Sequence, residues 1–420
     1  MHSNSSNVSI LFGVRHHCDH SVRPLRIVQV IASINEATGG TAVSVTGLAA
    51  SLARQGERSS IVALDYPRLG PLRPAGPAEV HLQPASFLAR HCGGFSPAFL
   101  RLLARVARDA DIVHNHGLWL FPNRYARIAA ERAGVALVTS PRGMLEPWSR
   151  NRARLKKLIA WQLYESANVR GATAFHATSD EEARSIRACG VRAPIAVIPN
   201  GVGAPTSLTG ARAAELRASL PGVGQKRYVL FLSRLHPKKG LELLLDAWRL
   251  IHDELRDVHL LIAGSDRTGY RATLEAKARD LGISDSVTFA GWIDGDLKGA
   301  AFANAEVFVL PSFSENFGTV VAEALSHGLP VITTTATPWK ELAERRCGWC
   351  IDIGVAPLAR SLREALTLSS HDRAEFAERG RALVRDRFSW ERIASDMVTF
   401  YRWVSCERCR AAAAPTFLAE

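Results

Sequence analysis

The 420-residue sequence contains no run of about 18 consecutive apolar residues, the length needed to span a bilayer. The apolar stretch from Val8 to Val14 is too short and too poorly flanked for a signal peptide. Cysteine is scarce, and its seven residues are scattered and odd in number, which argues against a secreted disulfide framework. We therefore expect a cytoplasmic protein with reduced thiols.

Zinc and nucleic-acid signatures are also missing. The two CxxC pairs, Cys347/Cys350 and Cys406/Cys409, lie much farther apart than the roughly 15 to 20 residues that zinc ribbons leave. The first pair is interpreted as a buried thiol pair in one strand and the second as an exposed pair in a C-terminal tail. No zinc-finger spacing and no aromatic RNP pattern occurs, so we expect no nucleic-acid partner.

Two short acidic motifs formally match a DxD metal site. We interpret Asp109-Ala-Asp111 as a helix-to-strand turn and Asp294-Gly-Asp296 as an exposed loop. Neither brings enough acidic ligands together, so no metal and no other cofactor is expected.

Basic residues exceed acidic ones, with a formal net charge of +12 and a pI near 9.7. This balance favours anionic partners, such as nucleotides, lipid phosphates, an acidic membrane surface or nucleic acid. Charge alone does not choose among these partners.

Short β-branched segments alternate with helical patterns along most of the chain, as in a parallel sheet with helical crossovers. The pattern runs from Arg26 to Pro199 and restarts at Tyr228, after a stretch rich in Gly, Pro and Ala. Because 420 residues exceed the usual size of one core, two domains are expected. We predict an α/β protein with an irregular extension (1–25), two Rossmann-like domains (26–205 and 206–388), a C-terminal helix that packs back on the body (389–405) and a tail (406–420).

Open parallel sheets bind ligands outside the carboxyl ends of their strands, and four clusters of polar residues follow predicted strands. The first is Gly39-Gly40-Thr41, where glycine allows a close backbone approach and a helix N-terminus offers N–H groups. A simple tight turn is the alternative. In the second cluster, strand alternation places His114 and His116 on one side, at the rim of the crevice. A satisfied structural histidine is the alternative there.

The third cluster is the basic loop Ser233–Gly240 (SRLHPKKG). Its arginine can form forked hydrogen bonds and its lysines act as point charges beside the start of a helix, an arrangement that suits a diphosphate. The alternative is a solvated basic loop. The fourth cluster is Ser314–Glu323 (SENFGTVVAE), in which a Gly-Thr step opens a helix. Its two glutamates can accept hydrogen bonds from the vicinal hydroxyls of a sugar and a ribose, although each alone would be surface charge.

Together these motifs resemble the retaining glycosyltransferases of family 4, which have the GT-B fold of two Rossmann-like domains facing each other across a cleft. The resemblance rests on the third and fourth clusters, on HNHG (114–117) at the end of the strand Asp111 to His116, and on PNGV at Pro199–Val202. It covers residues 26–404. It implies that the second domain binds the nucleotide diphosphate and the first presents the acceptor. Ser233 departs from the family, which usually has glycine before the arginine.

The resemblance implies roles for individual residues. Arg234 and Lys239 would grip the diphosphate, Glu315 would contact the sugar and His116 would face the transferred ring, as the catalytic group. The implied donor-binding residues are Ser233, Gly264, Asn316, Phe317, Gly318, Thr319 and Glu323, with Glu323 on the ribose. The implied acceptor-binding residues are Gly39, Gly40 and Arg142, the last from a loop SPRGML that related members carry.

The implied reaction is metal-independent, retaining transfer of a hexose from a UDP- or GDP-sugar to a glycan or polyprenyl-diphosphate-linked acceptor, in cell-surface polysaccharide biosynthesis. A sugar-nucleotide epimerase on the same fold and a non-catalytic anion-binding protein are the alternatives. The acceptor-side loops His114–Trp119 and Ser140–Trp148 favour transfer.

A basic and apolar segment follows the acceptor-side loop. Six basic residues and one acidic residue occur from Arg142 to Lys157, interleaved with apolar ones, namely Trp148, Leu155, Leu158, Ile159 and Trp161. We expect a helix from about Arg150 to Tyr164 that lies on an anionic membrane, at its inner face. The alternative is that its leucines form an ordinary core face.

Overall fold

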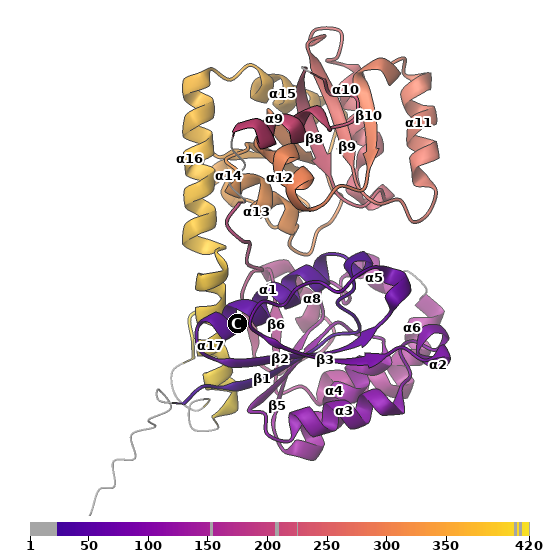
Figure 1. Cartoon of the computed structure of the whole chain (residues 1–420), viewed down its shortest axis with the longest axis vertical. Coiled ribbons are helices and arrows are strands. Elements are labelled where there is room, and N and C mark those ends of the chain that lie inside the picture. Colours follow the sequence, from indigo (N-terminus) through magenta and orange to yellow (C-terminus); the bar gives the residue numbers. More distant parts are fainter. Residues whose placement is uncertain are drawn as a thin grey trace, which may run out of the picture.

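The structure is a computed structural model that describes residues 23–151, 154–205, 210–224, 226–406, 410 and 414–419. Two α/β domains lie one above the other, and helices α16 (Ser370–Arg387) and α17 (Trp390–Ser405) run along one side of both (Figure 1). The predicted N-terminal extension lies almost entirely outside the described residues, as does Cys409 of the second CxxC pair.

The first domain contains an eight-stranded sheet in the order β14-β7-β6-β5-β4-β1-β2-β3, with every pairing parallel except that of β14 with β7. Its strands are β1 (Arg26–Val30), β2 (Arg58–Asp65), β3 (Glu79–Pro84), β4 (Ile112–His116), β5 (Ala136–Ser140), β6 (Ala174–Ala177), β7 (Ile195–Val197) and β14 (Leu418–Ala419). Its helices are α1 (Gly40–Arg54), α2 (Phe87–His91), α3 (Pro97–Ala107), α4 (Phe121–Ala133), α5 (Pro147–Asn151), α6 (Arg154–Ala160), the π-helical turn η3 (Trp161–Glu165), α7 (Ser166–Arg170) and α8 (Asp180–Arg187).

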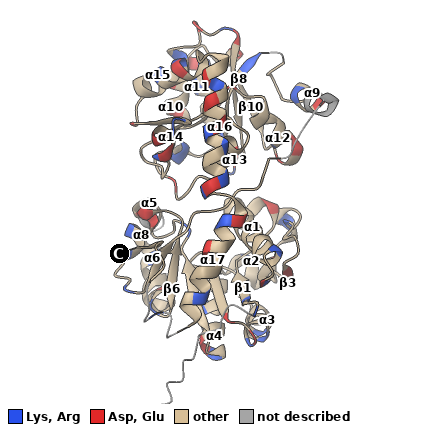
Figure 2. Ribbon diagram, turned by 90° about the vertical axis from the view of Figure 1, so that its left-hand side faces the viewer, with Lys and Arg blue, Asp and Glu red and all other residues tan. Residues whose placement is uncertain are grey.

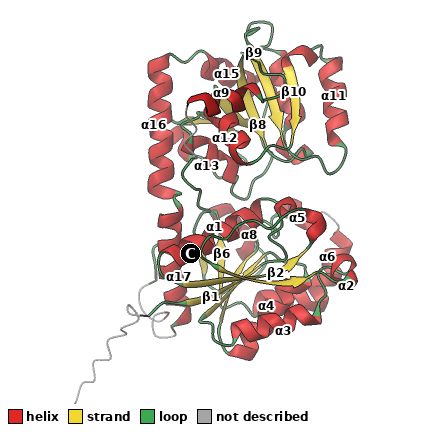
Figure 3. Ribbon diagram, in the orientation of Figure 1, coloured by secondary structure: helices red, strands yellow, loops and turns green. Residues whose placement is uncertain are grey.

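The second domain contains a six-stranded, all-parallel sheet in the order β10-β9-β8-β11-β12-β13, covered by helices (Figure 3). Its strands are β8 (Arg227–Leu232), β9 (Val258–Ala263), β10 (Val287–Gly291), β11 (Val307–Leu310), β12 (Val331–Thr334) and β13 (Gly348–Ile351). Its helices are α9 (Gly210–Ala218), α10 (Leu241–Arg249), α11 (Tyr270–Asp280), α12 (Gly295–Ala303), α13 (Thr319–Ser326), α14 (Glu341–Glu344), α15 (Val355–Leu366) and α16.

The sequence of the strands explains this layering. Strand β9 is buried at every residue because helices cover both faces of the sheet, as in other parallel sheets. In β4 the two faces differ: Val113 belongs to the core cluster beneath α3 and α4, whereas Ile112 packs with α1 and α17. The predicted fold class, two Rossmann-like parallel-sheet domains, is confirmed.

The chain crosses between the domains twice at neighbouring points. Val202, on the first crossing, pairs with Ser389 and donates from its backbone N–H to the Phe388 carbonyl at 2.8 Å. After this crossing, α17 packs on α1 and on the first sheet (Figure 2). The predicted tail is not all loose chain, since β14 extends the first sheet. Among the described residues no helix is both long and apolar enough to cross a membrane.

Candidate functional site

Loops from the carboxyl ends of both sheets meet at a cavity of about 140 Å³ between the domains. The first domain lines it with Gly40, Thr41, Ser44, Arg142 and Asn200, and the second with Glu315, Asn316, Phe317, Gly318 and Thr319. Seven residues that the sequence assigned to donor or acceptor binding, or to the sugar, therefore surround one space. His116 does not line this cavity directly.

Lys239 enters the site from the basic loop after β8. Its ammonium forms an ion pair with Glu315, whose carboxylate also accepts a hydrogen bond from Ser312 Oγ at 2.7 Å. Burial alone would raise the pKa of Glu315, but the Lys239 charge and these hydrogen bonds hold it below its ordinary value. The loop reaches this position because Gly240 (φ 70°) passes the carbonyl of Pro311 so closely that a Cβ atom would lie 2.0 Å from its oxygen.

The remaining donor-side residues have different surroundings. Gly318 caps α13 with φ 76°, and Trp339 Nε1 fixes the preceding carbonyl of Phe317 with a 2.5 Å hydrogen bond. Glu323 accepts from Lys298 Nζ of α12 at 2.7 Å, so the residue predicted to bind a ribose is ion-paired here. Arg234 is exposed and is not among the residues that line the small cavity.

Gly264 has a structural reason to be glycine. A Cβ atom there would lie 1.7 Å from the carbonyl oxygen of Ser233, at the point where β8 and β9 end. Its place in the site is thus to let these two strand ends approach each other. Ser233 itself is half-buried, and its backbone N–H donates to Ala263.

On the first domain, His116 and Arg142 form a pair. Arg142 has φ 57°, and its guanidinium donates from Nη1 to Asn200 Oδ1 at 2.7 Å and from Nη2 to His116 Nδ1 at 3.0 Å. His116 Nε2 lies 2.6 Å from Gln29 Oε1, so both ring nitrogens have partners. Burial and the Arg142 charge lower the pKa of His116 well below its ordinary value, which keeps the ring neutral. The prediction that both histidines lie at the crevice rim is wrong, because His114 is fully buried beneath it.

The loop after β4 is held by the α6 and η3 segment. Trp119 adopts φ 75°, its backbone N–H donates to Glu165 Oε2 at 3.0 Å, and its carbonyl accepts from Tyr164 Oη at 2.8 Å. Lys157 Nζ lies 5.4 Å from the Trp119 ring centroid, and the Trp161 ring is 6.2 Å from it. Glu165 is fully buried with Oε1 unpartnered, and burial raises its pKa to about 7.

Several polar contacts close the cleft. Glu146 of the first domain lies 3.5 Å from Lys238 Nζ and accepts from Ser314 Oγ at 3.2 Å. The Asn316 amide lies 2.8 Å from Thr178 Oγ1, and with its nitrogen turned to the carboxylate it donates to Glu182 at 2.9 Å.

A further contact corrects one sequence interpretation. Asp294 is not in an exposed loop: it caps α12 and lies 3.6 Å from Arg73 of the other domain. The other DxD match is a turn, as predicted, and Asp111 is bound there by Arg23. No group of three or more metal-ligating side chains occurs within the described part of the chain.

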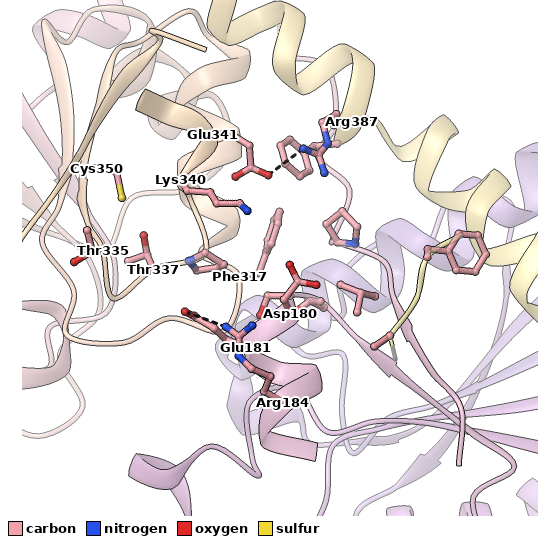
Figure 4. A pocket seen from close by; sticks show the side chains of 18 of the residues that line it. Asp180, Glu181, Arg184, Phe317, Thr335, Thr337, Lys340, Glu341, Cys350 and Arg387 are labelled. Atoms are coloured by element: carbon pink, nitrogen blue, oxygen red, sulfur yellow. Dashed lines mark hydrogen bonds and ion pairs between the residues drawn. The ribbon is translucent and has the colours of Figure 1, made fainter. Parts of the chain in front are cut away.

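A larger cavity of about 570 Å³ lies between the domains near the crossings (Figure 4). Arg387 pairs with Glu341 on one wall at 3.1 Å, and Arg184 with Glu181 on the other at 3.7 Å. Of the predicted site residues it contains Phe317 alone, so size does not identify the site here.

The segment after the acceptor-side loop lacks the core face that was the alternative to membrane contact. Four aliphatic side chains of α6 and η3 are largely exposed, so they form no core face: Leu155 (72%), Leu158 (56%), Ile159 (52%) and Leu163 (74%). We call them the α6 apolar face. Trp148 instead lies against Lys238 and His236 of the second domain, and Arg142 points into the site. Arg152 lies outside the described residues.

Reasoning from sequence missed several residues of this site. Asn200 belongs to the PNGV motif without a predicted role, and no role is predicted for Glu146, Lys238 or Lys298. Gln29 left one signal, a single amide among the apolar residues Ile27, Val28 and Val30 of β1.

Two family models match the chain. Residues 39–201 match the model described as "Glycosyl transferase 4-like domain" and residues 213–383 that described as "Glycosyl transferases group 1". A D-inositol 3-phosphate glycosyltransferase of Xylanimonas cellulosilytica is 29% identical over 396 residues, covering 86% of this chain and 91% of the relative. The chain spans about half the length of several other relatives. It covers 53% of a phosphatidyl-myo-inositol mannosyltransferase of Mycobacterium leprae, at 30% identity over 211 residues and 50% of this chain.

The fold is shared with solved structures. Anabaena Alr3699/HepE, crystallised in complex with UDP and glucose, superposes with a TM-score of 0.72 at 21% identity and covers 90% of this chain and 99% of its own. The two family models, their order along the chain and the two facing parallel sheets all point to the same family and fold. The chain therefore belongs to glycosyltransferase family 4 and has the GT-B fold.

Proposed function

We propose that this protein transfers a hexose from a UDP- or GDP-linked sugar to a glycan or a polyprenyl-diphosphate-linked acceptor, with retention of configuration and without a metal ion. One observation carries the proposal. Glu315, which is ion-paired with Lys239, and the start of α13 at Gly318 line a single cavity together with Arg142 of the other domain. A mycobacterial relative named as GDP-mannose-dependent and the UDP-bound neighbour suggest the first donors to test.

Leaving-group departure is the demanding step, because the nucleotide diphosphate gains negative charge as the anomeric carbon becomes cationic. Lys239, already held in place by Glu315, would meet that charge together with Arg234 and the first N–H groups of α13. Such preorganised donors cost no reorganisation during the reaction, and removing one typically lowers the rate by on the order of 10² to 10³. They replace the charge that a metal would supply.

Retention is proposed to arise from attack by the acceptor on the face that the leaving group departs from. Among the described residues that line the small cavity, Glu315 is the one carboxylate, and Lys239 binds it. A double displacement through an enzyme nucleophile would need a second, unpaired carboxylate. The leaving diphosphate would itself accept the acceptor proton.

Donor binding would require the cleft to open. Pockets for drug-sized ligands measure about 300 to 1,000 Å³, larger than the 140 Å³ cavity. The contacts of Glu146 with Lys238 and Ser314 would separate first, and the ribose would displace Lys298 from Glu323. Closing again around the donor would exclude water from the reacting carbon.

The α6 apolar face is proposed to contact an anionic bilayer and so bring a lipid-linked acceptor to the cleft. Its four aliphatic side chains are exposed, and they belong to the same segment that holds Trp119 beside the site. The surrounding sequence is basic, which favours anionic lipid.

Incubation with a panel of UDP- and GDP-sugars, with and without a polyprenyl-diphosphate disaccharide, tests the proposal. We expect release of nucleoside diphosphate that depends on the acceptor, survives EDTA, and yields a product with the anomeric configuration of the donor by NMR. An epimerised sugar nucleotide, binding without turnover, inverted product, or EDTA loss restored by magnesium would each overturn the corresponding part.

A further inference from the structure

A row of polar side chains is buried on the face of the first sheet that α17 covers. It consists of Gln29 on β1, His114 and His116 on β4, Ser140 on β5 and His176 on β6, none more than 3% exposed. Around it lies an apolar cluster that includes Ile27, Ile112, Met397 and Phe400. A buried polar group without a partner costs about 1 to 3 kcal/mol, so such a row persists only if its members bond one another.

The two ends of this row fix the direction of its hydrogen bonds. At one end Arg142 can only donate, so His116 Nδ1 is the acceptor of the 3.0 Å bond. The His116 proton therefore lies on Nε2 and is donated to Gln29 Oε1 at 2.6 Å. The other atom of that amide, Nε2, donates to the hydroxyl of Tyr401 on α17 at 3.4 Å.

At the other end the carbonyl of Ile198 can only accept, so His176 donates to it from Nε2 at 2.8 Å. His176 Nδ1 then accepts from Ser140 Oγ at 2.7 Å, and Ser140 accepts from His114 Nε2 at 2.7 Å. His114 Nδ1 is left as the acceptor for the Tyr401 hydroxyl, at 2.6 Å. The two halves meet at Tyr401, which accepts from one and donates to the other.

We propose that Tyr401 is a positioning residue, which acts through Gln29 and His116 to hold the Arg142 guanidinium at the interdomain cavity. Its hydroxyl links the two halves of this row of polar side chains and makes the Gln29 amide present its oxygen to His116. With that orientation His116 carries its proton on Nε2 and keeps Nδ1 bare for Arg142. The inference rests on the proposed function only in taking the interdomain cavity as the site of sugar transfer.

The charges around the row of polar side chains favour neutral histidines. The Arg142 charge acts on all three histidines and on Tyr401, and the carboxylate of Glu182 acts on Arg142. An additional proton on His116 would put its Nδ1–H and the Arg142 guanidinium, two donors, face to face. Burial and the Arg142 charge lower the pKa of His176 to about 3.

Tyr401→Phe removes only the hydroxyl, and Tyr228→Phe is a matched control. Tyr228 is equally buried and donates to the Ala301 carbonyl at 2.7 Å within the second domain. We expect Y401F to lower kcat at least tenfold and to move the acid limb of the kcat profile toward neutral pH, while Y228F changes only the melting temperature. Gln29→Glu, a second variant, should also move the acid limb upward because its carboxylate stabilises a charged His116.

Ring ¹⁵N spectra of histidine-labelled protein provide a readout that needs no activity. In the wild type, His114, His116 and His176 should each show a single Nε2–H tautomer between pH 5 and 8, and Y401F should show mixed tautomers for His114 and His116. Unchanged tautomers and pH profile in Y401F, while the wild type turns over, would overturn the inference alone. Absence of turnover in the wild type with the expected tautomer change in Y401F would overturn the proposed function alone.

Discussion

Lys239 and Glu315 are ion-paired at the carboxyl ends of two adjacent strands, β8 and β11, with the side chains about 10% exposed (11% and 10%). A buried pair of this kind is weak evidence for stability, because desolvation offsets much of the attraction. It does hold a cation at a defined point of the cleft. The first prediction follows from that position.

Lys239→Ala should lower kcat/KM for the sugar nucleotide by on the order of 10² to 10³, since one preorganised cation is lost. Glu323→Ala should mainly weaken donor binding. Lys277→Ala is the matched control, because Lys277 pairs with Asp246 at 2.8 Å on the outside of the same domain. Steady-state kinetics and a thermal melt of each variant provide the measurement. Wild-type efficiency in both K239A and E323A would show that the donor site lies elsewhere.

The neutral histidines make stability depend on pH. His176 has a pKa of about 3 in the folded protein against 6.5 ordinarily, so below pH 6.5 the unfolded chain binds a proton that the folded state refuses. Stability should thus fall as pH drops from 6.5, by about 1.4 kcal/mol per pH unit for each such histidine.

Denaturant unfolding between pH 5 and 7 measures this slope. His176→Gln keeps a donor for Ile198 but cannot titrate, so its slope should be smaller by about 1.4 kcal/mol per pH unit than that of the wild type. Equal slopes would mean that His176 is charged in the folded protein. The contributions of the other titrating groups are the same in both proteins, so they cancel in the difference between the two slopes.

The contribution of Glu165 to the pH dependence of stability should have the opposite sign. In the folded protein it keeps its proton up to about pH 7, whereas its ordinary value is 4.5. Ionisation therefore favours the unfolded state as pH rises from 4.5 to 7. The stability of Glu165→Gln relative to the wild type should increase across that window by on the order of 3 kcal/mol, as measured by urea unfolding. A pH-independent difference would contradict the buried, protonated state.

Membrane contact can be tested on the α6 apolar face. The double variant Leu155→Glu with Leu163→Glu should lose co-sedimentation with vesicles that contain phosphatidylglycerol, since both side chains are more than 70% exposed (72% and 74%). Leu250→Glu, which replaces an exposed leucine (52%) of the second domain, is the control. Binding should require anionic lipid and weaken with salt. Equal binding to neutral and anionic vesicles, or no binding at low salt, would show that the α6 apolar face is not a binding site for anionic membranes.

The alternation of strands and helices allowed the sequence to determine the two-domain fold, because buried parallel strands have near-continuous apolar sequences. Clusters after strands were also predictable: Gly40 and Arg142 follow strands of the first sheet and Glu315 follows a strand of the second, because parallel strands deliver their following loops to the carboxyl edge of their own sheet. Short edge strands such as β14 escaped prediction, since a two-residue pairing leaves no periodic signal.

Tertiary structure alone decided the partners of these residues. Strand alternation placed His114 and His116 on one face, but α17, almost 300 residues later (Tyr401 is 287 residues from His114), decided that this face is buried and hydrogen-bonded. Likewise the leucines of α6 have a helical spacing that suits either a core or a surface, and only the packing of neighbouring elements leaves them exposed. Periodicity specifies which side chains share a face, whereas long-range contacts determine what covers that face.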